Sequence, residues 1–451
     1  MRIAIIGSGP AGFYAAEALL KRADAAVDVD MFDRLPTPYG LVRGGVAPDH
    51  QKIKTVARVF ASTAARPTFR FLGNVRLGQD LTVQDLRAHY HQIVYATGNE
   101  ADRRLGIPGE GMTRCTPATV FVGWYNGHPD YRQARIDLSV DRVAVIGNGN
   151  VAVDAARMLL RTPAELEKTD VAEHALEVLR RNQVREVFIL GRRGPAQAAF
   201  SPAELKELGQ MEGVDPVVDA GELAHCAGTE PSGNAEGNRN LQILQSFAIR
   251  EARAHAKKLH FRFLVSPTEI IADAAGGVAG LVLAKNRLET RPDGSVAARA
   301  TGEAEVLEVG MVLPAVGYAG ERIAGVPYDE KARVIANEDG RVVDPVSRAV
   351  IANEYVVGWA RTGPQGLIGE HKRASADVVA QMIADGAQLS DRALPERDAI
   401  VSLLRERGVR PVSFNDWKQL DEVEVARGTR RGAPRDKFVD VQAMLAILGQ
   451  S

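Results

Sequence analysis

Two unbroken apolar runs, each followed at once by glycines, are the strongest pattern along the chain. Residues 2–6 are Arg-Ile-Ala-Ile-Ile, and residues 141–146 are Asp-Arg-Val-Ala-Val-Ile. Continuous apolar runs of this length lack the alternation of a half-exposed strand and are typical of strands buried on both faces of a parallel sheet. Beyond the glycines, residues 13–22 and 153–161 are rich in alanine and leucine or methionine, which predicts a helix in each place.

Each predicted helix leads to a second apolar run, and the two runs end in residues of opposite charge. Residues 27–32 end at Asp33, whereas residues 186–190 lead through one glycine to Arg192 and Arg193. Strand, turn, helix and strand in this order make up half of a doubly wound nucleotide-binding fold. The sequence therefore predicts an α/β protein with two Rossmann-like dinucleotide-binding domains.

The rest of the chain has less specific patterns. Residues 162–183 predict helices that begin at two capping boxes, Thr162-Pro-Ala-Glu165 and Asp170-Val-Ala-Glu173. Residues 227–240 predict a polar, glycine-rich loop. Three strands are predicted for an additional β layer in the second unit, at residues 259–264, 278–285 and 306–313. The tail from about Asp391 has amphipathic helical stretches and no motif.

Composition narrows the classes of function. A chain of 451 residues predicts two or three domains, and a net charge of -1 provides no overall basic field for nucleic acid. The two cysteines, Cys115 and Cys226, cannot form a CxxC redox pair or a thiolate metal site. No apolar run approaches the ~18 residues of a membrane span, and the first apolar run is too short for a signal peptide. We expect a cytoplasmic protein.

The first glycine turn has the pattern of a dinucleotide site. Gly7, Gly9 and Gly12 form G-x-G-x-x-G between the first strand and the first helix. In this motif the glycines allow a tight turn, the approach of backbone to a pyrophosphate, and close packing of helix on strand. The helix N-terminus favours the anion, and Asp33 at the end of the second strand can accept hydrogen bonds from a ribose. An acid at this position suits a ribose with free hydroxyls, as in FAD.

The second glycine turn is a variant with the opposite charge at its end. Gly147, Gly149 and Ala152 form G-x-G-x-x-A, and Arg192 and Arg193 follow the second strand. A guanidinium pair can clamp a 2′-phosphate with charge-assisted hydrogen bonds, whereas a carboxylate there would repel it. The second unit is therefore predicted to bind NADP(H) in preference to NAD(H).

Two further segments favour a flavin. Residues 93–98 form an apolar strand that ends in Ala-Thr-Gly, and residues 354–369 run from a strand into a glycine-rich turn before a helix predicted from Lys372. Backbone N–H groups in such a turn can approach flavin carbonyls, and a helix N-terminus can stabilise a reduced, anionic flavin. Trp359 lies in this turn and is a candidate for stacking there.

Five blocks occur in an order that resembles the adrenodoxin reductase family of ferredoxin–NADP reductases, bacterial members included. They are residues 7–16, 36–50, 147–154, 191–195 and 358–366. The resemblance runs from residue 2 to about 385 and implies a two-domain flavoprotein of glutathione-reductase-like topology. It implies an FAD domain built from residues 1–104 and 319–451 around an NADP domain of residues 105–318. It also implies the reaction: NADPH reduces FAD, which passes electrons to an iron–sulfur ferredoxin or adrenodoxin-type protein.

The resemblance also implies individual contacts. The residues that match FAD contacts of the family are Ala11, Asp33, Leu41, Val75, Trp359, Gly366, Leu367 and Ile368. Those that match its NADP contacts are Asn148, Gly149, Asn150, Val151, Arg192, Arg193, Glu204 and Gly366. The chain departs from the family where Asp33 replaces a more usual Glu, where Tyr39 replaces Trp, and over residues 370–375.

The expected reaction needs proton exchange at the flavin and a partner that accepts single electrons. His50, Asp154 and Glu207 are candidate proton-relay residues, and His50 is the best of them because it ends the block at 36–50. Ferredoxins are usually acidic, so docking should use basic residues. The candidate patch lies around a helix before the strand at residue 259 and comprises Arg250, Arg253, Lys257 and Lys258. Electrons could pass onward to a cytochrome P450 or to iron–sulfur assembly, and the sequence leaves that choice open.

Three other classes compete with this interpretation. A flavin monooxygenase and the electron-input subunit of a glutamate synthase share the two-domain pattern, although this chain has no cysteine cluster of the kind that would hold a fused iron–sulfur module. A disulfide reductase is excluded because it needs a CxxC pair. A non-catalytic nucleotide-binding module predicts bound nucleotide without flavin absorbance.

Overall fold

The computed structural model describes residues 1–21, 26–224, 235–251, 253, 256–386, 389 and 392–449. The chain forms two compact units. Unit 1 comprises residues 1–102 and 317–451, and unit 2 comprises residues 103–316. No helix in the described part of the chain is long and apolar enough to cross a membrane.

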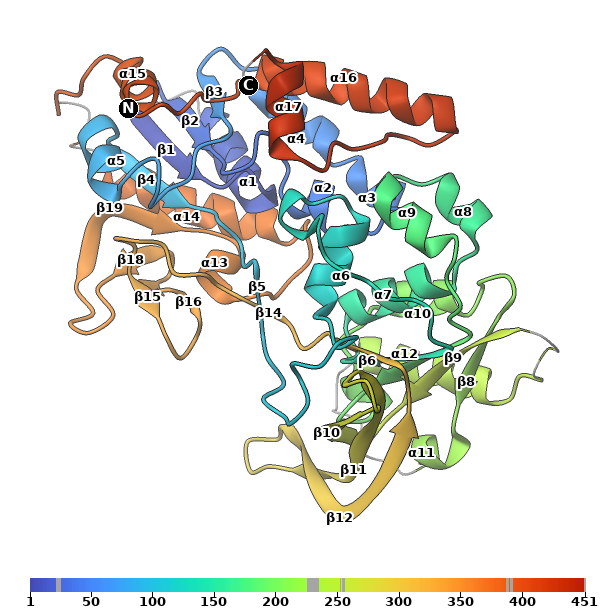
Figure 1. Ribbon diagram of the computed structural model, residues 1–451. Coiled ribbons are helices and arrows are strands. Elements are labelled where there is room, and N and C mark those ends of the chain that lie inside the picture. Colours follow the sequence, from blue (N-terminus) through green and yellow to red (C-terminus); the bar gives the residue numbers. More distant parts are fainter. Residues whose placement is uncertain are drawn as a thin grey trace. The chain divides into compact units, whose positions relative to one another are not determined.

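Unit 1 is built on a seven-stranded sheet to which both ends of the chain contribute (Figure 1). The strand order is β17 (Asn337–Glu338), β18 (Arg341–Val343), β19 (Val350–Val356), β4 (Gln92–Tyr95), β1 (Arg2–Ile6), β2 (Asp28–Phe32) and β3 (Phe69–Leu72). The five strands from β19 to β3 are parallel, and β17 and β18 join antiparallel at one edge. The expected doubly wound pattern is therefore present, with β19 from the C-terminal part of the chain beside β4.

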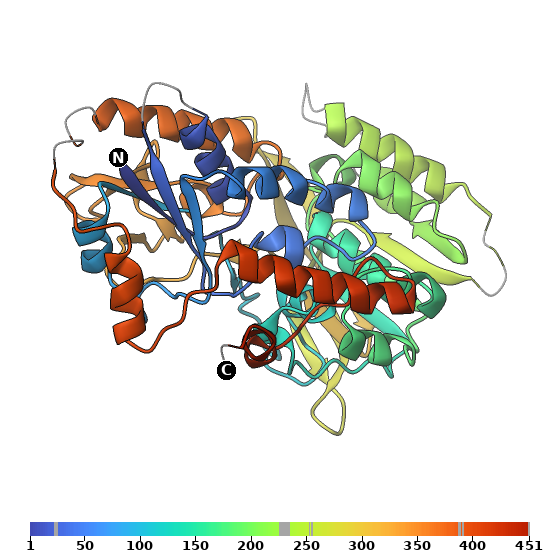
Figure 2. The same ribbon diagram turned by 90° about the horizontal axis from the view of Figure 1, so that it is seen from above.

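Helices cover this sheet and bury apolar side chains against it. α1 (Pro10–Leu20) and α14 (His371–Asp385) lie side by side, the dark blue and orange helices at the upper left of Figure 2. The helix predicted at residues 13–22 thus begins three residues earlier, with proline in its first turn, and Arg22 lies outside the described residues. The other helices of unit 1 are α2 (Leu41–Gly44), α3 (Gln51–Lys54), α4 (Ala57–Ala64), α5 (Val83–His89) and α13 (Trp359–Thr362).

The C-terminal tail belongs to unit 1 and forms three helices. They are α15 (Ala399–Glu406), α16 (Phe414–Arg431) and α17 (Val441–Ile447). α16 is the long red helix of Figure 2. Its buried Trp417 and Leu420 join the core cluster that contains Phe13 and Tyr39. The sequence predicted helices here but did not show that they complete the core of the N-terminal unit.

Short strand pairs also occur in this unit: β5 (Ala101–Asp102) with β14 (Tyr318–Ala319), and β15 (Tyr328–Asp329) with β16 (Val334–Ile335).

Unit 2 repeats the design with a five-stranded parallel sheet. Its order is β13 (Met311–Pro314), β6 (Arg142–Ile146), β7 (Glu186–Leu190), β9 (Lys257–Arg262) and β8 (Val214–Val218). α7 (Asn150–Leu160) follows β6 as predicted. The remaining helices are α6 (Ala118–Tyr125), α8 (Pro163–Glu167), α9 (Glu173–Leu179), α10 (Pro202–Leu208), α11 (Ala220–Ala224) and α12 (Ala235–Ala248).

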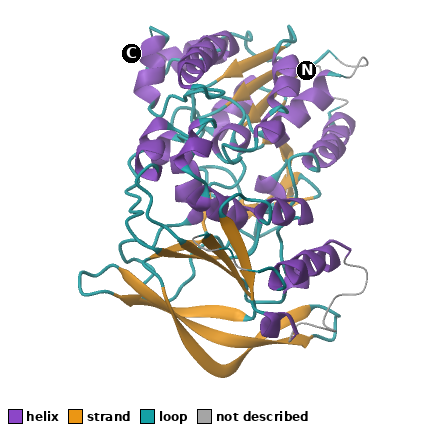
Figure 3. Cartoon of the chain, turned by 90° about the vertical axis from the view of Figure 1, so that its right-hand side faces the viewer, coloured by secondary structure: helices purple, strands orange, loops and turns teal. Residues whose placement is uncertain are grey.

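The additional β layer is a three-stranded antiparallel sheet, prominent at the bottom of Figure 3. It consists of β10 (Val265–Ala272), β11 (Val278–Thr290) and β12 (Val296–Glu308). Two strand predictions were wrong in detail. The strand predicted at 259–264 is β9 and belongs to the parallel sheet. The run 306–313 divides between β12 and the fully buried β13, because the chain turns at Gly310, whose N–H donates to the carbonyl of Arg142.

Two local predictions were also wrong. The described part of the predicted loop at 227–240 begins at residue 235 and is already helical in α12, where buried Asn240 donates to the carbonyl of Phe200. The capping box at Thr162 is present, but the one expected from Asp170 to Glu173 is not. α9 begins instead after Ala172, whose N–H donates to the carbonyl of Tyr125, so a tertiary contact fixes the start of the helix.

Candidate functional site

The first glycine turn leaves open space where a pyrophosphate is expected. Gly7 has φ +105°, and a Cβ on it would lie 2.3 Å from the carbonyl oxygen of Ala96. A Cβ on Gly12 would lie 2.2 Å from the carbonyl oxygen of Gly7. A Cβ on Gly9, by contrast, would meet nothing within 4 Å. Gly7 and Gly12 are therefore required by packing, whereas Gly9 leaves the surface of the turn free.

The N-terminus of α1 is suited to an anion. Gly9 is the N-cap residue, no side chain caps the helix, and its first turn holds no acidic residue. The first backbone N–H groups of a helix have no partner within it, and the helix dipole favours negative charge there. The turn thus fits a dinucleotide pyrophosphate.

Asp33 is held in place by its neighbours. One carboxylate oxygen accepts from the N–H of Ser8 at 2.9 Å and from the Ser8 hydroxyl, and the other accepts from the N–H of Leu35 at 2.9 Å. A carboxylate offers about four acceptor positions, so one remains for a ribose hydroxyl. Sequence reasoning missed Ser8, although a hydroxyl residue between two glycines and opposite a strand-end acid is a readable signal.

A segment that contains Leu41 covers the same turn. The N–H of Tyr39 donates to the carbonyl of Ser8 at 3.0 Å, and a Cβ on Gly40 would lie 2.9 Å from the Cα of Gly9. Leu41 begins α2 directly after this contact. Val75 is buried, and its N–H donates to the carbonyl of Asp33 at 2.9 Å. Leu41 therefore follows a segment that contacts the first turn, and Val75 contacts Asp33, whose carboxylate is bonded to that turn through Ser8.

The C-terminal glycine turn also reaches α1. Gly358 has φ +66°, and a Cβ on it would lie 2.5 Å from the Cβ of Ala11. The buried hydroxyl of Ser375 in α14 donates to the carbonyl of Ala11 at 3.3 Å. Trp359 begins α13, and its indole N–H donates to the carbonyl of Gln365 at 3.0 Å. The structure thus brings this turn to the N-terminal end of α1, as an FAD site built from both ends of the chain requires.

The loop over residues 366–370 contains the three remaining flavin candidates. Gly366 has φ +83°, Leu367 is largely exposed, and Ile368 packs on the core of unit 1. Glu370, where the chain departs from the family pattern, accepts from the N–H of Leu367 at 3.0 Å. This carboxylate therefore uses one of the loop N–H groups.

The second glycine turn has the same open design. A Cβ on Gly147 would lie 2.4 Å from the carbonyl oxygen of Ala315, whereas a Cβ on Gly149 would meet only the Cβ of Ala199, at 3.9 Å. Gly149 is the N-cap of α7, again without a side-chain cap or an acidic first turn. Loop 194–201 fixes the turn. The carbonyl of Asn148 accepts from the N–H groups of Ala199 and Phe200. The side-chain oxygen of Asn150 accepts from the N–H of Ser201.

Arg192 and Arg193 follow β7 and form a concentrated positive charge. Among the described residues, neither guanidinium has a carboxylate partner, and Arg193 makes only a long 3.5 Å contact with the carbonyl of Gln197. Burial and the neighbouring charge of Arg192 lower the pKa of Arg193. Two adjacent cations without a counter-ion fit a 2′-phosphate.

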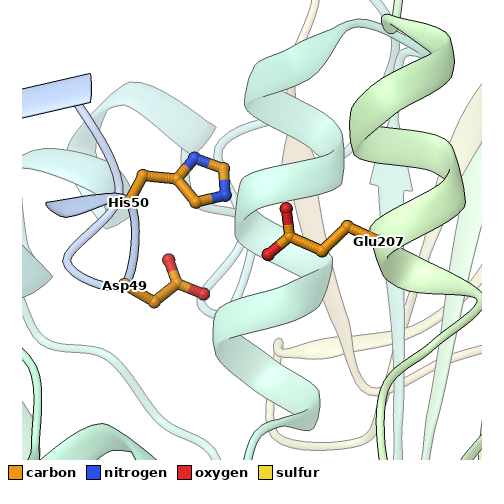
Figure 4. A group of neighbouring side chains, drawn as sticks. All are labelled: Asp49, His50 and Glu207. Carbon is orange, nitrogen blue, oxygen red and sulfur yellow. The ribbon is translucent and has the colours of Figure 1, made fainter. Parts of the chain in front are cut away.

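The proton-relay candidates lie on different elements. His50 follows Asp49 and is the N-cap residue of α3, while Glu207 comes from α10 (Figure 4). Asp154 lies on α7 and forms an ion pair with Arg157 at 2.5 Å, and the Arg157 side chain is fully buried. Asp154 therefore serves as the counter-ion of a buried cation. Glu204 lies in the first turn of α10, where its N–H donates to the Ser201 hydroxyl at 3.3 Å.

Known proteins resemble the chain over nearly its whole length. The family model for pyridine nucleotide-disulphide oxidoreductases matches residues 1–188. NADPH-ferredoxin reductase FprA of Mycobacterium tuberculosis is 43% identical over 458 residues, covering 99% of this chain and 98% of that protein. Human mitochondrial NADPH:adrenodoxin oxidoreductase is 40% identical, covering 99% of this chain and 92% of that protein. The chain belongs to the adrenodoxin reductase-like family of ferredoxin–NADP reductases.

A solved structure extends the match to three dimensions. FprA from Mycobacterium tuberculosis in complex with NADPH superposes with a TM-score of 0.94 at 41% identity, and the match covers 99% of each chain. The predicted two-Rossmann α/β class is therefore confirmed. As a member of this family, the chain is an oxidoreductase that uses FAD and NADP(H).

Proposed function

We propose that this chain is an NADPH-dependent ferredoxin reductase that binds FAD on unit 1 and NADPH on unit 2. The observation that supports this assignment is the pairing of two open glycine turns with opposite end charges. Asp33 suits the ribose of FAD, and Arg192 with Arg193 suits the 2′-phosphate of NADPH. The similarity to the mycobacterial and human reductases supports the same direction of electron transfer.

The cofactors supply the chemistry: FAD takes two electrons as hydride from NADPH and releases them singly to an iron–sulfur protein. The protein must place and insulate them. Gly9 and Gly149 leave room for the two pyrophosphates, and the uncapped N-termini of α1 and α7 provide donors for them. The FAD side would also be bounded by Ala11, Leu41, Val75 and the loop at 366–368. The NADP side would use Asn148 to Val151, Arg192, Arg193 and Glu204.

Proton exchange is assigned to His50. It ends the block at 36–50, whereas Asp154 already neutralises buried Arg157 and Glu207 lies 3.8 Å from the guanidinium of Arg161. Histidine is also the side chain that most often carries out general acid–base catalysis.

The assignment is tested by anaerobic reduction of a [2Fe–2S] ferredoxin by the purified protein, with NADPH and NADH compared in parallel. We expect flavin absorbance, fast reduction that depends on the protein, and preference for NADPH. Flavin reduction without ferredoxin reduction would turn the assignment toward a monooxygenase or a glutamate-synthase-type subunit. Bound nucleotide without flavin absorbance would indicate a non-catalytic module.

The acceptor is an acidic iron–sulfur protein that docks on basic residues of unit 2. The structure changes the composition of the predicted patch. α12 ends at Ala248, so Arg250 and Arg253 follow the helix, and Arg253 pairs with Asp215. Lys257 is half-buried in β9, where its ammonium donates to the carbonyl of Leu160 at 3.2 Å and burial lowers its pKa. Arg250 and Lys258 are both exposed, and neither forms an ion pair with a carboxylate of the described residues, so we assign the docking role to them.

Reversing the charge at Lys258 should weaken docking. We expect Lys258→Glu to raise the KM for ferredoxin about threefold to tenfold at low salt, with the difference fading as salt screens the interaction. Reduction of ferricyanide by NADPH should stay unchanged. The matched control is Arg291→Glu, in the turn between β11 and β12, which alters net charge by the same amount. Equal KM values for the two variants would place docking elsewhere.

A further inference from the structure

We propose that tail helix α16 positions the FAD-binding turn by clamping the segment at residues 39–45, called the cover segment below. The inference rests on the proposed function, because it concerns how unit 1 holds FAD. The contact is long-range in sequence: Arg43 and Glu424 are separated by 381 residues and form a buried ion pair. Arg43, Trp417 and Glu424 are its positioning residues.

The cover segment has a conformation that needs support. Tyr39 has φ +86°, a left-handed value that costs free energy for a residue with a large side chain. Gly40, with φ +48°, brings its Cα against Gly9 so closely that a Cβ there would lie 2.9 Å from the Gly9 Cα. A small shift of this segment would therefore alter the space above Gly9, where the pyrophosphate is expected.

α16 supports Tyr39 through its side chain. The Tyr39 ring meets the Trp417 ring edge to face at 5.9 Å and the Phe13 ring at 5.5 Å. Tyr39 from the cover segment and Trp417 from the tail are both more than nine-tenths buried. Burial raises the pKa of the Tyr39 phenol to about 12, so the ring stays neutral. Trp417 of the tail thus packs against Tyr39, the residue with the strained backbone.

α16 supports Arg43 through charge and geometry. Both guanidinium Nη atoms donate to the carboxylate of Glu424, one of them at 2.8 Å, and the guanidinium lies 5.0 Å from the centre of the Trp417 ring. Lys437, just beyond the helix, donates to the backbone carbonyl of Arg43 at 3.1 Å. Side chain and backbone of the cover segment are therefore held at once.

The carboxylate of Glu424 is saturated by partners that fix its position. It is fully buried, and besides Arg43 it accepts from Arg435 at 3.3 Å and from the N–H of Phe438 at 2.9 Å. Buried ion pairs add little stability over apolar side chains of the same size, but their fork geometry restricts orientation. An apolar tail helix could fill this core equally well. The pair is therefore better explained by orientation of the cover segment than by stability alone.

The test measures FAD affinity in protein from which the flavin has been removed, by titration with FAD and recording of flavin fluorescence. The main variant is the double substitution Arg43→Met with Glu424→Met, which removes both charges of the pair together. Arg435 loses Glu424 but keeps its ion pair with Asp421, so no buried charge is left without a partner and the variant should fold. We expect its Kd for FAD to rise about tenfold, because the turn is no longer held in its binding geometry. The near-ultraviolet to visible circular dichroism of bound flavin should change as well. Arg43→Lys, which keeps the charge but loses the fork, should show a smaller rise of about threefold.

A second tail ion pair provides the control. Arg397 donates to Asp30 at 2.8 Å, and Asp30 also pairs with Arg70, so Arg397→Met removes a tail contact without stranding the carboxylate. The Arg397 side chain does not touch the cover segment, so the Kd of the Arg397→Met variant for FAD should equal that of the wild type. If the double variant is folded and binds FAD as tightly as the wild type, α16 is structural only and the inference fails. If the wild-type protein itself takes up no FAD, the proposed function fails instead.

Discussion

Replacement of both Arg192 and Arg193 by glutamine should raise the KM for NADPH by about ten- to a hundredfold and leave the KM for NADH within about twofold. The two guanidinium groups are adjacent, and neither is neutralised by a described carboxylate, so their charge is available to a ligand. Each charge-assisted hydrogen bond to a phosphate contributes about 1.5–3 kcal/mol, and each ~1.4 kcal/mol is tenfold in affinity. NADH lacks the 2′-phosphate and loses nothing.

The measurement is steady-state reduction of ferricyanide with each nucleotide, which needs no ferredoxin. Arg180 and Arg181 provide a matched control, because they are also adjacent arginines of unit 2 and both are exposed. Arg180 is already paired with Glu167 and Glu173, so the double glutamine variant there should leave both KM values unchanged. If the KM for NADPH rises equally in the two double variants, the effect is one of general charge and the 2′-phosphate assignment is wrong.

The two glycine turns could be predicted from the sequence because each of their features is local. A buried strand, a glycine turn, a helix and a strand-end charge lie within a few tens of residues, and each part restricts the others. Each turn is tightly packed at its first glycine, Gly7 or Gly147, and leaves open space at its second, Gly9 or Gly149; the fold class follows from the repetition of this unit. Local patterns of this kind need no knowledge of distant contacts.

Contacts between distant segments could not be predicted. The start of α9 depends on a hydrogen bond from Ala172 to Tyr125, and a capping box was expected nearby. The division of 306–313 into two strands was visible in principle, since the alternating pattern of β12 changes to the continuous apolar run of β13. The pairing of Arg43 with Glu424 had no signal at all, because two charges far apart in a sequence do not indicate each other.

Gly9→Ser should weaken the binding of FAD alone and Gly149→Ser the binding of NADPH alone, and both variants should keep the fold. Each glycine is an N-cap residue with extended backbone, and a Cβ there meets no atom closer than 3.9 Å. Serine is a favoured N-cap residue, so its hydroxyl should accept from an early helix N–H and keep or slightly raise the melting temperature. The same hydroxyl takes the donor and the space that a pyrophosphate needs. We expect affinity for the corresponding dinucleotide to fall about ten- to a hundredfold.

The two variants should fail in different ways, and this difference is the test. Gly9→Ser should be purified with little or no flavin absorbance, whereas Gly149→Ser should remain yellow and lose reduction by NADPH at concentrations that saturate the wild type. Dithionite reduces flavin without a nucleotide site, so it should still bleach Gly149→Ser. Gly7→Ser is the contrasting control: φ +105° and the 2.3 Å approach to Ala96 predict loss of folding rather than selective loss of FAD. Flavin retained at wild-type occupancy in Gly9→Ser would show that the FAD pyrophosphate does not lie on the first turn.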